Sequence, residues 1–236
     1  MSTFQENINS STILNRKLIV ELRFAPVAEF FDKKGAILEE MTPLISNSFW
    51  SLGDMAIRIS DAQTEDKARS SIAVEVNRFA FVSSKIDTLQ RFVDDVAKMY
   101  SILTKTYQKI RIKRIGCRIQ GSYKTRSRKF DDVVQGFKQS FPTNLFFNDF
   151  SLNDLRLEIR HDQGMYILGP VNVNDSFVNR NFTYDEKKEG VGIGIDTDNF
   201  LVDANGENLN SIERIYDVIR ASLSVEKTLV ERFGSL

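Results

Sequence analysis

The side chains that could do chemistry are few in this sequence, and the first candidates are two aspartates, Asp196 and Asp198. Both lie in a segment that alternates like a strand, so their carboxylates are expected on one side of it. Such a pair can hold Mg²⁺, as a metal-assisted phosphodiester or nucleotide enzyme would require. Acids at a strand end and in the turn before a helix are the plainer interpretation. We therefore expect no cofactor, and Asp196 and Asp198 are the residues that would carry a metal if one were bound.

The other reactive side chains are single: one histidine, His161, and one cysteine, Cys117. Zinc needs several such ligands, and a catalytic triad needs a nucleophile and an acid that converge on the histidine. His161 precedes the turn sequence Asp-Gln-Gly, and Cys117 lies among alternating apolar residues. We expect a hairpin histidine and a small core cysteine, hence no disulfide and no catalytic centre. A thiol activated by the neighbouring Arg114 and Arg118 is the alternative.

Charge is distributed unevenly along the chain. The 32 basic and 32 acidic residues balance, yet residues 96–130 hold eleven basic residues and no acid. That window carries +11 and the remaining 201 residues carry −11. A basic segment can track phosphates, and tyrosines beside it can stack on bases. The candidate binding residues are Lys109, Arg111, Lys113, Arg114, Lys124, Arg126, Arg128 and Lys129.

The zero net charge favours a different interpretation of the basic segment. Nucleic-acid-binding domains are commonly strongly basic overall, and this chain is not. The segment would then pair with acidic surface on the same chain, or with an acidic face of a second copy or another protein.

Eighteen phenylalanines are present, and four of them gather around Pro142 in a segment without periodicity. They are Phe141, Phe146, Phe147 and Phe150. Such a cluster either packs at the junction between two halves of a chain or anchors an interface. Junction packing is the favoured interpretation, and an aromatic interface is the alternative.

The elements that must position these residues follow from the apolar periodicity. Period-two alternation predicts strands at residues 17–24, 54–59, 72–76, 79–82, 107–123, 152–159, 165–173, 176–184 and 191–202. Helical spacing predicts helices at residues 26–46, 84–103 and 131–140, and a final helix that Asn210 and Glu213 cap and Gly234 ends.

Strands come in runs instead of alternating with helices, so the predicted fold class is α+β. We expect one or more mostly antiparallel sheets with long amphipathic helices on one face. Residues 1–15 are predicted to be disordered, residues 16–130 to form an N-terminal half, and residues 131–236 a C-terminal half that ends in a long helix. Two similar subdomains that meet near residues 125–150 fit this rhythm, and one continuous domain is the alternative.

Membrane attachment is not expected. The longest apolar runs are a few residues, and the first ten residues lack the basic and apolar regions of a signal peptide. A cytoplasmic protein is the resulting expectation.

Five segments carry a resemblance to a known family: residues 20–24 (Val-Glu-Leu-Arg-Phe), 78–81 (Arg-Phe-Ala-Phe), 114–118 (Arg-Ile-Gly-Cys-Arg), 193–196 (Ile-Gly-Ile-Asp) and the final amphipathic helix. In these segments the chain resembles a sporadically distributed family of uncharacterised bacterial proteins. The resemblance implies no catalytic residues. The patchy distribution of that family is similar to that of genes in mobile or anti-phage islands, which implies a component of such a system.

The sequence therefore predicts a non-enzymatic protein-interaction or self-assembling module, a homo-oligomer or the partner of another protein. Recognition would use the basic segment or the aromatic cluster. The alternative is a protein that binds nucleic acid or nucleotide phosphates through residues 98–129.

Overall fold

The computed structural model describes residues 3–141, 155–172, 174–183, 186, 190–204, 206 and 208–236. In this part of the chain the strands are β1 (Ile13–Phe24), β2 (Phe49–Leu52), β3 (Ala56–Ser60), β4 (Ser70–Glu75), β5 (Arg78–Ser83), β6 (Ile112–Lys124), β7 (Leu157–His161), β8 (Gly164–Asn172) and β9 (Val191–Val202). The α-helices are α1 (Glu29–Met41), α2 (Leu89–Thr106), α3 (Phe130–Gln139), α4 (Ser176–Asn181) and α5 (Ile212–Phe233), and short 3₁₀ helices cover η1 (Thr42–Leu44) and η2 (Glu65–Lys67).

The strands hydrogen-bond in the order β2-β3-β4-β5-β1-β6-β9-β8-β7. The pairs β2–β3, β3–β4, β4–β5, β5–β1 and β7–β8 are all antiparallel. An α+β fold built on an antiparallel sheet is therefore confirmed. Strand β9 also confirms the predicted limits, residues 191–202.

The chain divides into two compact units, each made of three stretches of sequence. Unit 1 consists of Met1–Glu6, Lys17–Arg118 and Asn199–Ala221. Unit 2 consists of Asn7–Arg16, Ile119–Asp198 and Ser222–Leu236. Strands β1, β6 and β9 and helix α5 each contribute residues to both units.

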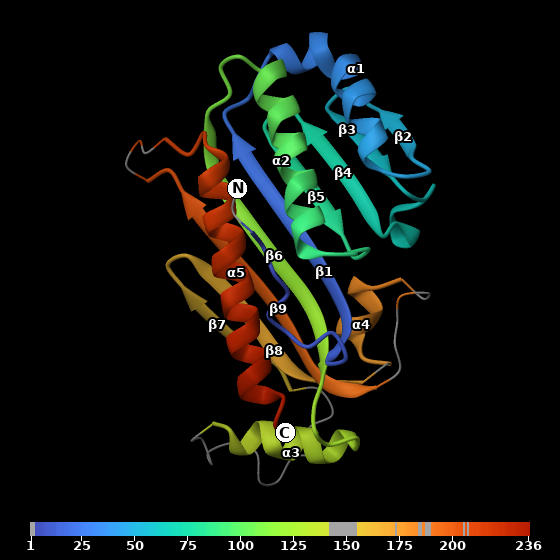
Figure 1. Ribbon diagram of the computed structural model, residues 1–236, viewed down its shortest axis with the longest axis vertical. Coiled ribbons are helices and arrows are strands. Elements are labelled where there is room, and N and C mark those ends of the chain that lie inside the picture. The colour runs from blue at the N-terminus through green and yellow to red at the C-terminus, as the bar shows by residue number, and fades with distance from the viewer. Residues whose placement is uncertain are drawn as a thin grey trace. The chain divides into compact units, whose positions relative to one another are not determined.

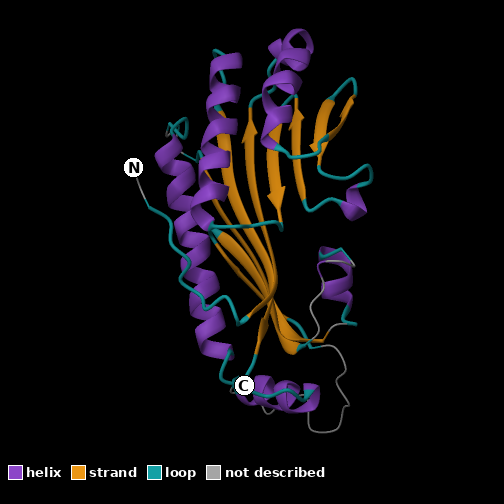
Figure 2. Cartoon of the chain, turned by 45° about the vertical axis from the view of Figure 1, so that its right-hand side comes forward, coloured by secondary structure: helices purple, strands orange, loops and turns teal. Residues whose placement is uncertain are grey.

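The core of unit 1 follows from the strand register. Leu22, Phe79, Val74 and Ile57 stand opposite one another on four neighbouring strands, and all four are fully buried. Directly opposite residues share a face of the sheet, so these side chains form one apolar layer. Helices α1 and α2 contact each other, α1 contacts β3, and both helices lie against the same face (Figures 1 and 2).

Helix α2 begins later than the sequence predicts. Thr88 is its N-cap, and the Thr88 side chain accepts a hydrogen bond of 3.1 Å from the Arg91 N–H. Ser84, the first residue of the predicted helix, instead donates its hydroxyl to the Arg69 carbonyl at 3.1 Å. The Ser84 hydroxyl thus bonds to the chain beside the end of β5. Thr88, further along, caps the helix.

The core of unit 2 gathers Tyr123, Val133, Phe137, Ile193 and Phe233. Strand β9 lies so close to β6 here that a Cβ on residue 192 would be 1.8 Å from the Tyr123 carbonyl oxygen, and only Gly192 fits. The glycines of residues 190–194 therefore allow backbone packing, and their strand runs on without a helix that could hold a phosphate.

Two further local predictions are wrong. Residues 176–181 form helix α4 in place of a strand, because the Asp175 side chain caps the Phe177 N–H at 2.8 Å and so nucleates a helical turn. Asn210 does not cap α5: its side-chain amide donates to the Ile110 carbonyl and accepts from the Ile112 N–H at 2.8 Å. Ser211 provides the cap contact to Arg214 N at 3.3 Å.

Candidate interaction edge

The strand portion of the predicted basic segment is paired with acids of its own unit. Arg111 and Lys113 both reach the Asp203 carboxylate, at 3.3 and 3.2 Å. The Asp203 side chain is 1% exposed, and the Lys113 hydrogen bond, aided by Arg111, lowers its pKa below the ordinary aspartate value. These two cations already have a counter-ion within the chain.

Arg114 belongs to an ion-pair ladder on the face of the unit 1 strands that points away from the apolar layer. Its guanidinium lies 2.9 Å from the Glu21 carboxylate and 4.7 Å from the centre of the Phe200 ring. Glu21 also pairs with Arg78 at 3.6 Å, and Arg78 pairs with Glu75 at 2.5 Å. The hydrogen bond to Glu75 raises the pKa of Arg78. Alternating charges therefore cross this face from strand to strand and satisfy one another.

The loop portion of the segment remains open to solvent. Lys124, Arg126, Arg128 and Lys129 belong to unit 2 and are exposed, and within the described residues none of them forms an ion pair. The Arg126 and Ser127 N–H groups bond to the carbonyls of Gly234 and Leu236, which fixes the loop backbone. Lys109, in unit 1, is exposed as well.

Of the four phenylalanines around Pro142, the structure describes only Phe141. Phe141 packs in unit 2, with ring centres 5.1 Å from Phe137 and 6.0 Å from Phe233. Phe146, Phe147 and Phe150 lie outside the described residues. Phe141 is thus a partly buried packing residue of the unit 2 core.

The next residues to place are the aspartates Asp196 and Asp198, the histidine His161 and the cysteine Cys117. The Asp196 carboxylate accepts a hydrogen bond of 3.1 Å from Gln120 and is buried, whereas Asp198 is half-buried. Over the described ranges, no three His, Cys, Asp or Glu side chains gather as a metal would require. His161 ends β7 in a hairpin opposite Gly164, and Cys117 is fully buried, as the sequence predicts.

A buried polar network in unit 2 was not predicted. Glu226 of α5 is fully buried; one carboxylate oxygen pairs with Arg16 and the other accepts from the Tyr123 hydroxyl. Gly121 leaves room for that hydroxyl, since a Cβ at this position would lie 2.2 Å from it. The signal in the sequence was a single acid, Glu226, on the apolar stripe that runs from Ile219 to Val230 of the last helix.

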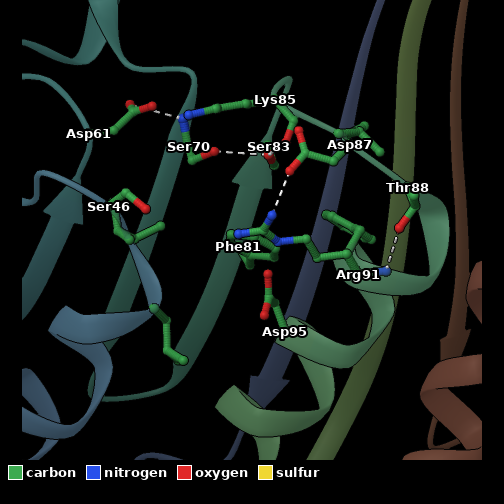
Figure 3. A pocket seen from close by; sticks show the side chains of 14 residues that line it. Ser46, Asp61, Ser70, Phe81, Ser83, Lys85, Asp87, Thr88, Arg91 and Asp95 are labelled. Atoms are coloured by element: carbon green, nitrogen blue, oxygen red, sulfur yellow. Dashed lines mark hydrogen bonds and ion pairs between the residues drawn. The ribbon is translucent and has the colours of Figure 1, made fainter.

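A small polar pocket lies at the start of α2 in unit 1 (Figure 3). Arg91 and Asp87 form an ion pair of 2.6 Å beside it, and the Ser70 and Ser83 hydroxyls bond to each other at 2.9 Å. Its volume is about 70 Å³, room for a few water molecules and far below that of metabolite sites. The ion pair ties the first turn of α2 to the loop before it, the two serines join the ends of β4 and β5, and we assign the pocket a structural role.

Exposed apolar side chains are concentrated at one edge of unit 1. Seven large apolar residues of the described chain are exposed, and only Ile159 and Val202 lie elsewhere. The other five, which we call the apolar edge, are Phe31 (49% exposed), Phe49 (43%), Trp50 (60%), Leu52 (43%) and Met55 (54%). A concentration of this kind on a surface commonly marks an interaction site.

The apolar edge is formed by β2 and the segments beside it. Strand β2 is the first strand in the sheet order and pairs only with β3 (Figure 1). Met55 lies in the turn between the two strands. Lys34 of α1 donates to the Gly53 carbonyl at 3.3 Å, and Phe31 lies one helical turn before Lys34 on the same side of α1.

Register decides which way the β2 side chains face. Trp50 stands opposite Ile59 and Leu52 opposite Ile57, and both isoleucines are fully buried. Trp50 and Leu52 therefore continue the apolar layer of unit 1 out to the edge of the sheet. Phe49 projects from the other face.

The backbone of β2 has free hydrogen-bonding groups on its outer side. Gly53 donates its N–H to the Ala56 carbonyl at 2.9 Å, which marks a hydrogen-bonded pair. Bonded and non-bonded pairs alternate in an antiparallel ladder, so Phe49 and Ser51 bond to β3. Trp50 and Leu52 direct their N–H and C=O groups toward the free side.

The opposite edge of the sheet is protected against pairing. Strand β7 carries Glu158 and Arg160, which form an exposed ion pair. Charged side chains on an edge strand discourage a further strand from adding. Strand β2, Phe-Trp-Ser-Leu, carries no charge.

No model of a known protein family matches this sequence, and no curated protein matches it. Among the helices that the structure describes, none has the length and apolarity needed to cross a membrane. Function is therefore inferred from the site itself.

Proposed function

We propose that this protein is a non-enzymatic interaction module that binds a protein through the apolar edge. The observation that carries the proposal is the exposed, uncharged strand β2, which has free backbone groups and an apolar side-chain surface. Binding adds a strand to β2: backbone hydrogen bonds provide affinity, and Trp50, Leu52 and Phe49 act as anchors.

Thiol labelling tests the proposal, because Cys117 is buried and a new cysteine would be the accessible one. Ser51→Cys places a thiol in the middle of β2, and Glu158→Cys places one on the charged edge strand β7. We expect Cys-directed labelling at position 51 to be several-fold slower in the native cells than in dilute purified protein. Labelling at position 158 should differ little. Equal labelling of position 51 in both settings would refute docking at this edge.

A second function is favoured by the basic loop. Lys124, Arg126, Arg128 and Lys129 are exposed without ion pairs in the described structure, as a phosphate-binding surface requires. We propose nucleic-acid or nucleotide-phosphate binding as the alternative function of this loop.

The loop is tested by the binding of labelled DNA and RNA at about 50 mM salt. Reversal of Arg126, Arg128 and Lys129 to Glu should weaken binding and lower the salt slope by about 3. A control with exposed lysines of unit 1 outside the basic segment reversed, Lys67→Glu and Lys85→Glu, should keep both. The absence of any shift for the wild-type protein would exclude this function.

The biological setting and the finer architecture remain part of the proposal. We propose a bacterial, cytoplasmic protein of an anti-phage or mobile-element system, supported by the resemblance described above. We also propose two similar halves, each with long amphipathic helices on one face of its strands. Co-occurrence of the gene with defence genes in sequenced genomes would test the first part. Superposition of residues 16–130 on residues 131–236 in an experimental structure would test the second.

A further inference from the structure

Strand β2 has the chemistry to pair with itself. We propose that the apolar edge is occupied by a second copy of this chain, with the two β2 strands antiparallel about a two-fold axis. This inference rests on the proposed docking function of the same edge and names its partner.

The faces of the sheet restrict the register between the copies. A two-fold axis perpendicular to the sheet keeps the helix-covered faces of both copies on one side, so residues that pair must have the same facing. Trp50 and Leu52 face the helix-covered side, and Phe49 and Ser51 face the other. Trp50 can therefore stand opposite Trp50 or Leu52 of the second copy, but never opposite Ser51.

The free backbone groups select one of these registers. Trp50 and Leu52 are the residues of β2 whose N–H and C=O groups point outward. Trp50 opposite Leu52 of the other copy, and the reverse, makes two hydrogen-bonded pairs wholly within β2. Ser51 then stands on the axis, opposite Ser51 of the second copy in a non-bonded pair. In this register each indole also lies beside a leucine on the same face.

The absence of charge on β2 and the symmetry of a β2–β2 contact also favour a second copy as the partner. Strand β2 has no charged residue, and residues 46–48 before it are Ser-Asn-Ser. In the proposed register Asp54, which follows β2, stands opposite Ser48 of the second copy, so no like charges meet. Pairing of β2 with the other edge, β7, would build an open fibre, and the Glu158–Arg160 pair opposes it. A β2–β2 contact is self-complementary and closes after two copies.

The apolar surface available matches a small interface. Each of the five residues of the apolar edge is about half exposed, which is about 100 Å² for an aromatic residue. The five residues of both copies then bury roughly 1,000 Å², the lower end of specific interfaces. We therefore expect a weak dimer whose population rises with protein concentration.

Disulfide trapping tests both the partner and the register. Directly opposite residues of a non-bonded pair have Cα atoms about 4.5 Å apart, within the range of about 4.4–6.8 Å that a disulfide spans. Ser51→Cys should give a covalent dimer, twice the 27.0 kDa of one chain, under mild oxidation. Phe49→Cys, next along the same face, and Glu158→Cys on β7 should stay largely monomeric.

The mass and fluorescence of the unmodified protein complete the test. Light scattering should report a dimer as concentration rises, and the emission of Trp50, the single tryptophan, should shift to the blue. Trp50→Lys and Leu52→Lys should each be monomeric with an unchanged circular dichroism spectrum, because both side chains are exposed.

Three results would overturn the inference. The first is a monomer at every concentration, and the second is a dimer in which Ser51→Cys does not cross-link. The third is a purified monomer whose position 51 is nevertheless protected in cells. This last result would reject the second copy as partner while the proposed docking function stands, whereas free labelling in cells would reject both.

Discussion

The Glu226 network in unit 2 makes a sharp prediction about stability. Glu226 is fully buried: one carboxylate oxygen pairs with Arg16, and the other accepts a hydrogen bond from the Tyr123 hydroxyl. Glu226→Gln preserves the shape of the side chain but leaves one acceptor oxygen for two donors. It also removes the carboxylate charge that faces the buried Arg16 guanidinium.

The size of the effect follows from the burial of this pair. Removal of one partner of a buried ion pair costs about 3–5 kcal/mol, since the remaining charge stays desolvated. For a chain of this length 1 kcal/mol corresponds to about 2–4 °C in Tm, so a loss of about 10 °C is expected. Glu231→Gln is the matched control on the same helix: its partner Lys227 lies 3.6 Å away and both side chains are exposed. That exposed pair should contribute under about 0.5 kcal/mol.

Thermal unfolding followed by circular dichroism measures both variants. A double variant adds a test of the shared acceptor: Tyr123→Phe removes one donor, so in Glu226→Gln it should cost far less than in the wild type. The reasoning is refuted if Glu226→Gln melts together with Glu231→Gln. Additive losses in the double variant would refute the shared acceptor.

Two further predictions concern other groups of unit 1. Tyr107 is fully buried, and its hydroxyl has no hydrogen-bond partner in the described structure, so Tyr107→Phe should raise stability by about 1 kcal/mol in urea unfolding. Burial raises the pKa of Tyr107, so the wild type should also lose stability above about pH 10, where the unfolded chain ionises first, and Tyr107→Phe should lose less. Asp203→Asn should lower the Tm at pH 7, since Lys113 and Arg111 then face a neutral amide. Because the pKa of Asp203 is lowered in the folded protein, the stability that its charge provides is lost as the pH falls below about 4, and the difference from wild type should shrink there. A pH-independent difference would contradict this account of Asp203, and a lower urea midpoint for Tyr107→Phe would contradict that of Tyr107.

Periodicity predicted the elements whose side chains alternate between core and solvent. Strand β9 and helix α5 are long and have a continuous apolar set, so their patterns are unambiguous. The short strand β2 was missed, because all four of its residues are exposed and no buried face imposes a period. The α4 segment was misassigned because one side chain, that of Asp175, outweighs the strand preference of the residues that follow.

The candidate site was harder to predict, for a physical reason. The cations of the basic segment were visible in the sequence, but the acids that pair with Arg111, Lys113 and Arg114 lie about ninety residues away, and only the fold brings them together. Trp50 was visible too, but its exposure depends on the place of β2 in the sheet order.

The interleaving of the two units affects how the protein is made and inherited. Unit 1 can be completed only after Ala221 has been synthesised, and unit 2 only after Ser222–Leu236 has been. Until Asn199–Ala221 has been made, unit 1 lacks its parts of β9 and α5. No single cut releases either unit whole, so recombination cannot move one of them into another gene as a cassette.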